Sequence, residues 1–240
     1  MDVIIKRISN TISLVIMFFV AAMFYFEYKG FALVDGKIVL QRQEALAAER
    51  NGIADVLPSD IRVNVSSKYA LGSANAPLTL YEYSSLGCPH CANFHLDVMP
   101  KLIEEYVKNG LMRIIFVHFP LDKKSMKAAM ISHCMSYENY FGYLDEMFDN
   151  QRSWWLDSDD ERLFQYAAEF GLSYDETLSC MNNDAIAHEI VTNRQEAISR
   201  LGVQGTPSFL LSGPDGNEII YGEPSYSSLK DYIDSRLQRL

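Results

Sequence analysis

Two cysteines separated by two residues are the part of this chain best suited to redox chemistry. Cys88-Pro89-His90-Cys91 stands between an apolar run typical of a strand and a run with helical spacing, which places the pair at the start of a helix. There the unpaired backbone N–H groups and the positive end of the helix dipole favour the thiolate of the first cysteine. We therefore expect Cys88 to be exposed and nucleophilic. Cys91, one turn later, is expected to be the more buried thiol that resolves a mixed disulfide or closes a bond with Cys88.

His90 is expected to donate a hydrogen bond to the Cys88 thiolate or to stabilise it by charge. A stabilised thiolate stabilises the reduced pair, and each pKa unit gained below ambient pH contributes about 1.4 kcal/mol, or about 30 mV towards a stronger oxidant. The motif therefore predicts a pair that passes its disulfide on to other proteins.

Two other uses of a C-x-x-C pair remain open at this point. Structural zinc requires four ligands, and the sequence contains no second C-x-x-C. His95, four residues after Cys91, leaves a Cys/His metal site as one alternative, in a metal-binding or copper-delivery module. An inert structural clip is the other.

The elements around the motif follow an α/β order. A strand over 78–83 leads into the motif, a helix continues to Val107 with a kink expected at Pro100, and a continuously apolar strand follows over 112–117. This is a βαβ unit with Cys88 where the first strand passes into its helix.

An inserted helical block is predicted over about 122–201. Ser158-x-x-Glu161 and Ser173-x-x-Glu176 are capping boxes that should begin two of its helices. Beyond it, strands over 208–211 and 218–221 are joined by the turn residues 214–217, and a final helix reaches the C-terminus. The order is βαβ, helical block, ββα.

The N-terminal residues 1–28 predict a membrane anchor. Lys6 and Arg7 precede an apolar stretch, and the 21 residues from Ile8 to Tyr28 are long enough, at about 1.5 Å of rise each, to cross a hydrocarbon core of about 30 Å. The basic residues favour a cytoplasmic N-terminus with the rest of the chain outside. A signal peptide cleaved after Ala22 is the alternative. With either an anchor or a cleaved signal peptide, the domain would be exported to an oxidising compartment, where disulfides persist.

Residues 29–67 read as a tether that contains a short helix over about 38–50 and holds the domain, 68–240, clear of the membrane. An oligomerisation helix is the alternative for this stretch. Net charge of −10, with 21 basic and 31 acidic residues, argues against a nucleic-acid-binding surface. Hydrophobic residues make up 48% and the four cysteines are few for 240 residues, which excludes a disordered chain and a small disulfide scaffold.

A second short motif, Gly205-Thr206-Pro207, stands immediately before a predicted strand. Together with the Cys-Pro-His-Cys motif and the helical insertion, it makes residues 63–240 similar to the DsbA-like family of thioredoxin-fold disulfide oxidoreductases. The resemblance implies a cis-Pro207 facing the cysteines, a substrate-facing Cys88, no bound cofactor or metal, and reoxidation by a membrane quinone-linked thiol oxidase.

Glu82 matches a buried acid of this family, on the strand that leads into the motif. Its apolar and aromatic neighbours predict a low-dielectric site with a raised pKa, from which it would relay a proton to or from Cys91. An exposed strand glutamate is the alternative. Thr206 departs from oxidases that carry valine there and matches isomerase-type relatives, which leaves an isomerase or reductase as the rival activity.

Cys134 and Cys180 both fall in the helical block on inward-facing positions. In an oxidising compartment we expect them to form a structural disulfide, as some DsbA-like relatives have in their inserted helices. Two buried free thiols are the alternative.

The sequence thus predicts a single-pass protein of the bacterial inner membrane whose domain faces the periplasm. There it would oxidise unfolded, newly exported proteins by exchange through Cys88–Cys91.

Overall fold

The structure is a computed structural model that describes residues 31–34, 37–40, 53–57 and 69–240. The chain forms two units, Met1–Asn51 and Gly52–Leu240. In the first, β1 (Phe31–Val34) and β2 (Lys37–Leu40) form an antiparallel hairpin. Everything described below belongs to the second unit.

A six-stranded mixed sheet forms the centre of the second unit, with strand order β3-β8-β7-β5-β6-β4. Its central strands β5 (Leu78–Ser84) and β6 (Met112–His118) run parallel, as expected of a βαβ unit. β7 (Ser208–Gly213) and β8 (Gly216–Tyr221) add an antiparallel hairpin on the other side of β5. The short β4 (Ala70–Leu71) and β3 (Ile53–Leu57) close the two edges.

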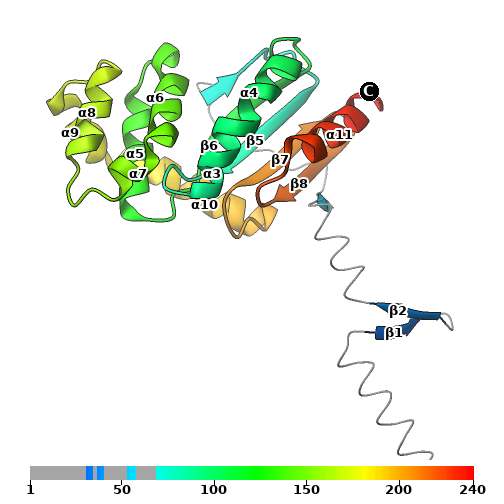
Figure 1. The fold of residues 1–240 in the computed structure, drawn as a ribbon. Helices are drawn as coiled ribbons and strands as arrows, with labels where there is room; N and C mark the ends of the chain where they lie inside the picture. The colour runs from blue at the N-terminus through cyan, green and yellow to red at the C-terminus, as the bar shows by residue number, and fades with distance from the viewer. Residues whose placement is uncertain (1–30, 35–36, 41–52, 58–68) are drawn as a thin grey trace, which may run out of the picture. The chain divides into compact units, whose positions relative to one another are not determined.

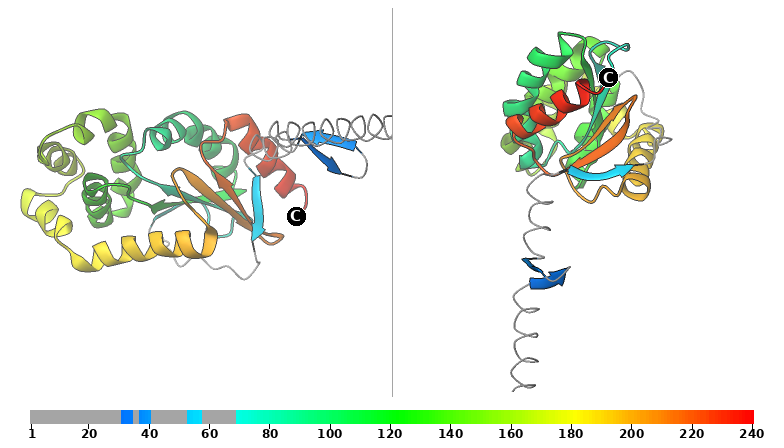
Figure 2. Two further views of the ribbon diagram at one scale, coloured as in Figure 1. Left: turned by 90° about the horizontal axis from the view of Figure 1, so that it is seen from below. Right: turned by 90° about the vertical axis from the view of Figure 1, so that its right-hand side faces the viewer.

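Helices cover both faces of this sheet. On one face, the helical run after β5 and the C-terminal α11 (Tyr226–Leu237) pack on the apolar side chains of β5, β6 and β7 (Figure 1). On the opposite face lies α10 (Asp184–Leu201), which runs from the helical block along the sheet (Figure 2). Gly202 ends α10 in a left-handed conformation at φ 69°, which a glycine adopts without steric cost.

The helical run that begins at the cysteine motif is not uniform. It consists of α3 (Pro89–Asn93), the π-helical segment η2 (Phe94–Val98), α4 (Met99–Leu102) and a second π-helical segment, η3 (Ile103–Val107). Pro100 has no backbone N–H, so the regular α-helical pattern of backbone hydrogen bonds cannot continue through it. The π-helical turns of η2, which are wider than α-helical turns, lie directly before α4. A kink was predicted at Pro100, and the structure shows alternating α-helical and π-helical segments along the whole run instead.

The inserted block consists of five helices, followed by α10. They are α5 (Lys123–Cys134), α6 (Tyr137–Asp149), α7 (Gln151–Trp155), α8 (Glu161–Glu169) and α9 (Tyr174–Met181). They gather at one end of the sheet around a core of their own, which also includes Cys88 and Cys91 (Figure 1). The predicted order of βαβ, helical block, ββα is confirmed.

Three local expectations differ from the structure. Residues 38–40, expected to begin a short helix, form β2, because Asp35-Gly36 between two apolar runs is a strong hairpin signal; residues 41–50 lie outside the described part. Residues 53–57, assigned to the tether, form the edge strand β3 against β8. Ser173 makes the expected capping box, whereas α8 begins after Asp160, and the Glu161 N–H is bound by Asp159 instead of Ser158.

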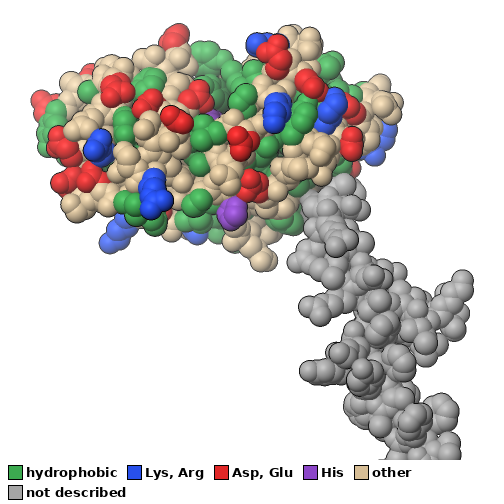
Figure 3. Space-filling view, viewed as in Figure 1, with side chains coloured by type: hydrophobic (Ala, Val, Ile, Leu, Met, Phe, Trp, Pro, Cys, Tyr) green, Lys and Arg blue, Asp and Glu red, His purple; other side chains and the backbone are tan. Residues whose placement is uncertain are grey.

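Within the residues described, no helix is both long and apolar enough to span a bilayer, and the expected anchor over 1–28 lies outside them. Acidic side chains are spread over the viewed face of the folded unit, in keeping with the net charge of −10 (Figure 3).

Candidate active site

Cys88 occupies the N-cap of α3, at the end of the loop that leaves β5. Its carbonyl accepts hydrogen bonds from the N–H groups of Cys91 and Ala92, both at 3.1 Å, and its own N–H donates to Ser85 O at 3.0 Å. Pro89 follows at the first helical position, where a missing N–H is harmless and the fixed φ suits the helix. The local sequence therefore fixes the cysteine at the positive end of a helix.

The sulfur of Cys88 is more covered than the sequence predicts. The residue is only 7% exposed, because its Sγ lies against the carbonyl oxygen of Thr206, at 3.4 Å. Hydrogen bonds from the Cys91 thiol, with smaller contributions from Thr206 and backbone N–H groups, lower the pKa of Cys88 to about 5, although burial opposes the shift. Cys88 is therefore a thiolate at neutral pH.

Cys91 has the opposite character. It is fully buried, and desolvation together with the neighbouring Cys88 raises its pKa, against smaller opposing contributions from Ser84 and Ser85. One thiol of the pair is ionised and the other stays protonated. This asymmetry is what an attacking and a resolving thiol need.

The Thr206–Pro207 peptide bond is cis and stands directly before β7. The Thr206 carbonyl is the group that contacts Cys88, so this loop forms one wall of the redox centre. Beside the wall lies a hollow of about 480 Å³, lined by Gly202, Gln204, Gly205, Thr206, Pro207, Ser208, Tyr221 and Gly222. Thr206, which lines this hollow, is also the residue that contacts Cys88.

Glu82 is completely buried on β5, which excludes the exposed alternative. Neither carboxylate oxygen has a hydrogen-bond partner of good geometry. Desolvation raises the pKa of Glu82 to about 7, and the nearby His95 imidazole and Ser84 hydroxyl partly oppose that rise. A carboxyl group with this pKa gives up and accepts protons readily at neutral pH.

The His90 imidazole contacts Glu223, a partner that the sequence did not predict. Its Nδ1 lies 2.8 Å from Oε2 of Glu223, in the loop between β8 and α11, and the imidazole is 70% exposed. The hydrogen bond and charge of Glu223, and to a lesser degree Cys88, raise the pKa of His90. Glu223 therefore favours the protonated, positively charged form of His90, which in turn favours the Cys88 thiolate.

We expect Glu223→Gln to weaken this arrangement. Without the carboxylate, the pKa of His90 falls, so the imidazole is neutral over more of the range around pH 7 and the Cys88 thiolate loses part of its electrostatic support. The pKa of Cys88 should rise by roughly half a unit, as for a solvent-exposed pair. Thiolate absorbance against pH measures this shift, and Asp231→Asn, an exposed position on α11, is the matched charge control. Equal titrations of the two variants would contradict the role of Glu223.

The helical block also holds the motif in place. The Gln151 side chain on α7 donates to Leu86 O at 2.6 Å and to Cys88 O at 3.0 Å. A Cβ on Gly87 would stand 2.3 Å from Ser125 Oγ and 2.9 Å from the Trp155 ring, so only glycine permits this close approach. These residues have no motif spacing, and nothing in the sequence identifies them.

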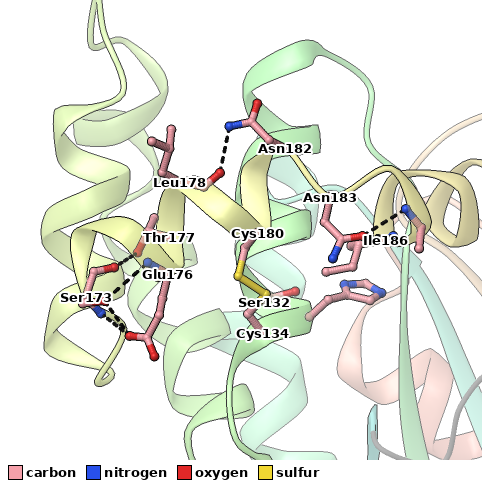
Figure 4. The surroundings of a disulfide bond; sticks show 12 residues. Ser132, Cys134, Ser173, Glu176, Thr177, Leu178, Cys180, Asn182, Asn183 and Ile186 are labelled. Atoms are coloured by element: carbon pink, nitrogen blue, oxygen red, sulfur yellow. Dashed lines mark hydrogen bonds between the residues drawn. A yellow bond between two sulfur atoms is a disulfide. The ribbon is translucent and has the colours of Figure 1, made fainter.

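Cys134 and Cys180 form a disulfide that joins the end of α5 to α9, away from the C-x-x-C motif in sequence (Figure 4). Cys88 and Cys91 are both free cysteines and are not joined by a disulfide. Among the described residues, no group of three His, Cys, Asp or Glu side chains converges as metal ligands; His95 binds Asp145 instead.

Known proteins share this fold. A family model described as Thioredoxin matches residues 64–235. A crystal structure of Wolbachia pipientis alpha-DsbA1 superposes with a TM-score of 0.65 at 34% identity, over 71% of this chain and 91% of that one. A protein-disulfide isomerase from Novosphingobium aromaticivorans superposes with a TM-score of 0.62 at 26% identity, over 70% of this chain and 96% of that one.

A protein of Rickettsia conorii that carries the name protein-disulfide oxidoreductase is 27% identical over 70% of this chain. The match covers 60% of that relative's length.

Proposed function

Since the chain belongs to the DsbA-like family of thioredoxin-fold proteins, we propose that it is a protein thiol:disulfide oxidoreductase that introduces disulfide bonds into exported proteins. A thiolate of an unfolded substrate attacks the Cys88–Cys91 disulfide, a mixed disulfide forms at Cys88, and the substrate's second thiol resolves it.

The observation that carries this proposal is the opposite behaviour of the two thiols. With a pKa of about 5, Cys88 is ionised and is a good leaving group, whereas burial keeps Cys91 protonated. A stable Cys88 thiolate favours the reduced pair, by about 30 mV for each pKa unit below ambient pH, and so makes the disulfide a stronger oxidant. This supports the proposed direction of transfer, from the protein to its substrates.

The proposed setting is the periplasmic side of the bacterial inner membrane. The apolar stretch over 8–28 supports a single anchor, with the basic Lys6 and Arg7 on the cytoplasmic side. A membrane quinone-linked thiol oxidase would return Cys88–Cys91 to the disulfide after each cycle. Resistance of the mature protein to carbonate extraction tests the anchor, and an N-terminus at Met23 would show cleavage instead.

An isomerase is the second candidate. Thr206 before the cis-proline is the residue found in isomerase-type relatives, and one similar structure carries the name protein-disulfide isomerase. An isomerase works from the reduced state, because its free thiolate must attack substrate disulfides. The redox state of the pair in the cell therefore distinguishes the two activities.

Thiol trapping of the full chain in a bacterial host tests the proposal. Cells are quenched in acid, free thiols are alkylated with a mass-shifting maleimide, and peptides that contain Cys88 and Cys91 are analysed by mass spectrometry. We expect a pair that is mostly disulfide. A mostly reduced pair would establish the isomerase instead, and thiols that react only after chelation would establish a metal-binding module.

A further inference from the structure

Cys91, the buried cysteine of the pair, must gain a proton when the disulfide opens and lose it when the disulfide closes. When a substrate thiolate attacks Cys88 Sγ, the Cys88–Cys91 bond breaks and its electron pair stays on Cys91 Sγ. Cys91 is fully buried, so a thiolate there is strongly disfavoured and the sulfur must take up one proton. Glu82, which shares Ser84 as a neighbour with Cys91, supplies that proton and becomes a carboxylate. Cys88 needs none, because it leaves as a thiolate when the substrate's second thiolate resolves the mixed disulfide.

Glu82 cannot exchange protons with water directly. The residue has no exposed surface, and both of its oxygens lack hydrogen-bond partners. Each turnover therefore requires a group that connects Glu82 to the surface, to return the proton after substrate oxidation and remove it when Cys91 is reoxidised.

His95 occupies the position for this connection. It lies one turn after Cys91 on the same helical run and is 3% exposed, with its ring centroid 4.5 Å from that of Phe148 and 6.4 Å from that of Phe116. Phe116 pairs with Glu82 in the parallel register of β5 and β6, so the two side chains project from the same face of the sheet. The imidazole and the carboxyl thus share one buried space, and the imidazole is close enough to lower the pKa of Glu82.

The two ring nitrogens of His95 face different surroundings. Nδ1 is buried and has no hydrogen-bond partner, as is true of both Glu82 oxygens. Nε2 donates to Oδ1 of Asp145 on α6 at 2.7 Å, and the Asp145 side chain is 69% exposed. Because a carboxylate only accepts hydrogen bonds, the contact with Asp145 places a proton on Nε2.

We infer that His95 and Asp145 form the proton route between solvent and the buried Glu82–Cys91 pair. On reoxidation, Glu82 first passes its proton across a bridging water to Nδ1 of His95, because the two side chains do not hydrogen-bond directly, and Nε2 releases its own proton to Asp145 and water. The Glu82 carboxylate then takes the proton of Cys91 Sγ. After substrate oxidation, a proton travels the same path in reverse. The inference rests on the proposed function. His95 and Asp145 act through Glu82 and not on the sulfur, so they are positioning residues.

The other titratable groups around this space do not offer a second route. His118 on β6 is buried, and its Nε2 is shared between Ser132 Oγ at 2.8 Å and Tyr140 OH at 3.1 Å, both of which are themselves buried. Burial lowers the pKa of His118, and burial raises the pKa of Tyr140, so both stay neutral. Tyr69 and His133, which pack on Tyr140 and His118, are themselves buried, and Cys88 is the thiolate of the pair. The hydrogen bond of His95 to Asp145 is the one described here that joins a side chain of this space to an exposed carboxylate.

Asp145→Asn is the sharpest test, because the exposed side chain leaves packing undisturbed. Asp149→Asn, on an exposed position one turn further along α6, makes the same change in charge and is the matched control. The oxidised full-length protein is mixed with a reduced dithiol peptide, and the single-turnover rate of disulfide opening is followed from pH 5 to 8. We expect Asp145→Asn to be at least about tenfold slower near pH 7, and Asp149→Asn to equal the wild type.

Two further readouts separate proton transfer from a structural effect. Added imidazole should accelerate Asp145→Asn and leave the wild type unchanged, and Asp145→Glu should recover most of the rate, while melting temperatures stay equal. Equal rates for Asp145→Asn and Asp149→Asn, or a slow variant that imidazole does not rescue, would overturn the inference. Failure of the wild type to oxidise the peptide would instead count against the proposed function.

Discussion

Cys88→Ser is expected to abolish oxidation of a reduced, unfolded substrate, with a loss of roughly 10³-fold or more in rate, because it removes the sulfur that the substrate thiolate attacks. Serine fits the N-cap of α3 as well as cysteine does, so the fold should be kept. Its hydroxyl, unlike the thiol with a pKa of about 5, can neither form a disulfide nor leave as a stable anion at neutral pH. The measurement is the rate of disulfide formation in reduced ribonuclease, with the melting temperature as control. Retained activity would disprove the role of Cys88.

Cys91→Ser separates the second role from the first. Cys88 would still exchange with substrate disulfides, but the buried thiol that closes the pair would be missing. Covalent complexes with substrates should therefore accumulate on non-reducing gels and disappear after reduction. Accumulation in Cys88→Ser instead would reverse the assignment of the two cysteines.

Local sequence was sufficient to predict the centre of this site. Cys88 and Cys91 belong to a short motif whose chemistry is set by neighbours in the chain, whereas Pro207 and Glu82 were identified by the resemblance to the DsbA-like family, with the apolar neighbours of Glu82 predicting its burial. Strands β5 and β6 are largely apolar runs, and such runs are typical of buried parallel strands. In each case the determining contacts lie within one or two elements.

The supporting residues depend on tertiary contacts, and there the sequence was silent. Glu223 meets His90 across 133 positions, and Asp145 meets His95 across 50. An exposed glutamate or aspartate in a chain with 31 acidic residues carries no sign of its partner. β3 was missed for a related reason, because its assignment depends on the open edge of β8 and not on its own pattern. The tertiary fold determines which residues surround a motif, whereas the motif itself can be recognised from its residue types and spacing.

The disulfide between Cys134 and Cys180 is expected to act on stability and not on catalysis. It joins α5 to α9 and closes a loop of 46 residues, for which the loss of chain entropy in the unfolded state corresponds to on the order of 4 kcal/mol. Neither cysteine is among the groups that shift the pKa of Cys88 or Cys91. We therefore expect the Cys134–Cys180 bond to stabilise the helical block and to have little effect on disulfide exchange at Cys88–Cys91.

The double substitution Cys134→Ala with Cys180→Ala should therefore lower the melting temperature by about 10 °C, which corresponds to a loss of roughly 2–4 kcal/mol for a unit of this size. Substrate oxidation below the melting transition should stay within about twofold of the wild type, since Gln151 and the Cys88 loop keep their contacts. The double variant is preferred to either single one, because a lone free thiol beside a C-x-x-C pair could form a wrong disulfide. Scanning calorimetry and the ribonuclease assay measure the two effects. An unchanged melting temperature, or free thiols at both positions in protein from an oxidising compartment, would show that this bond does not stabilise the fold.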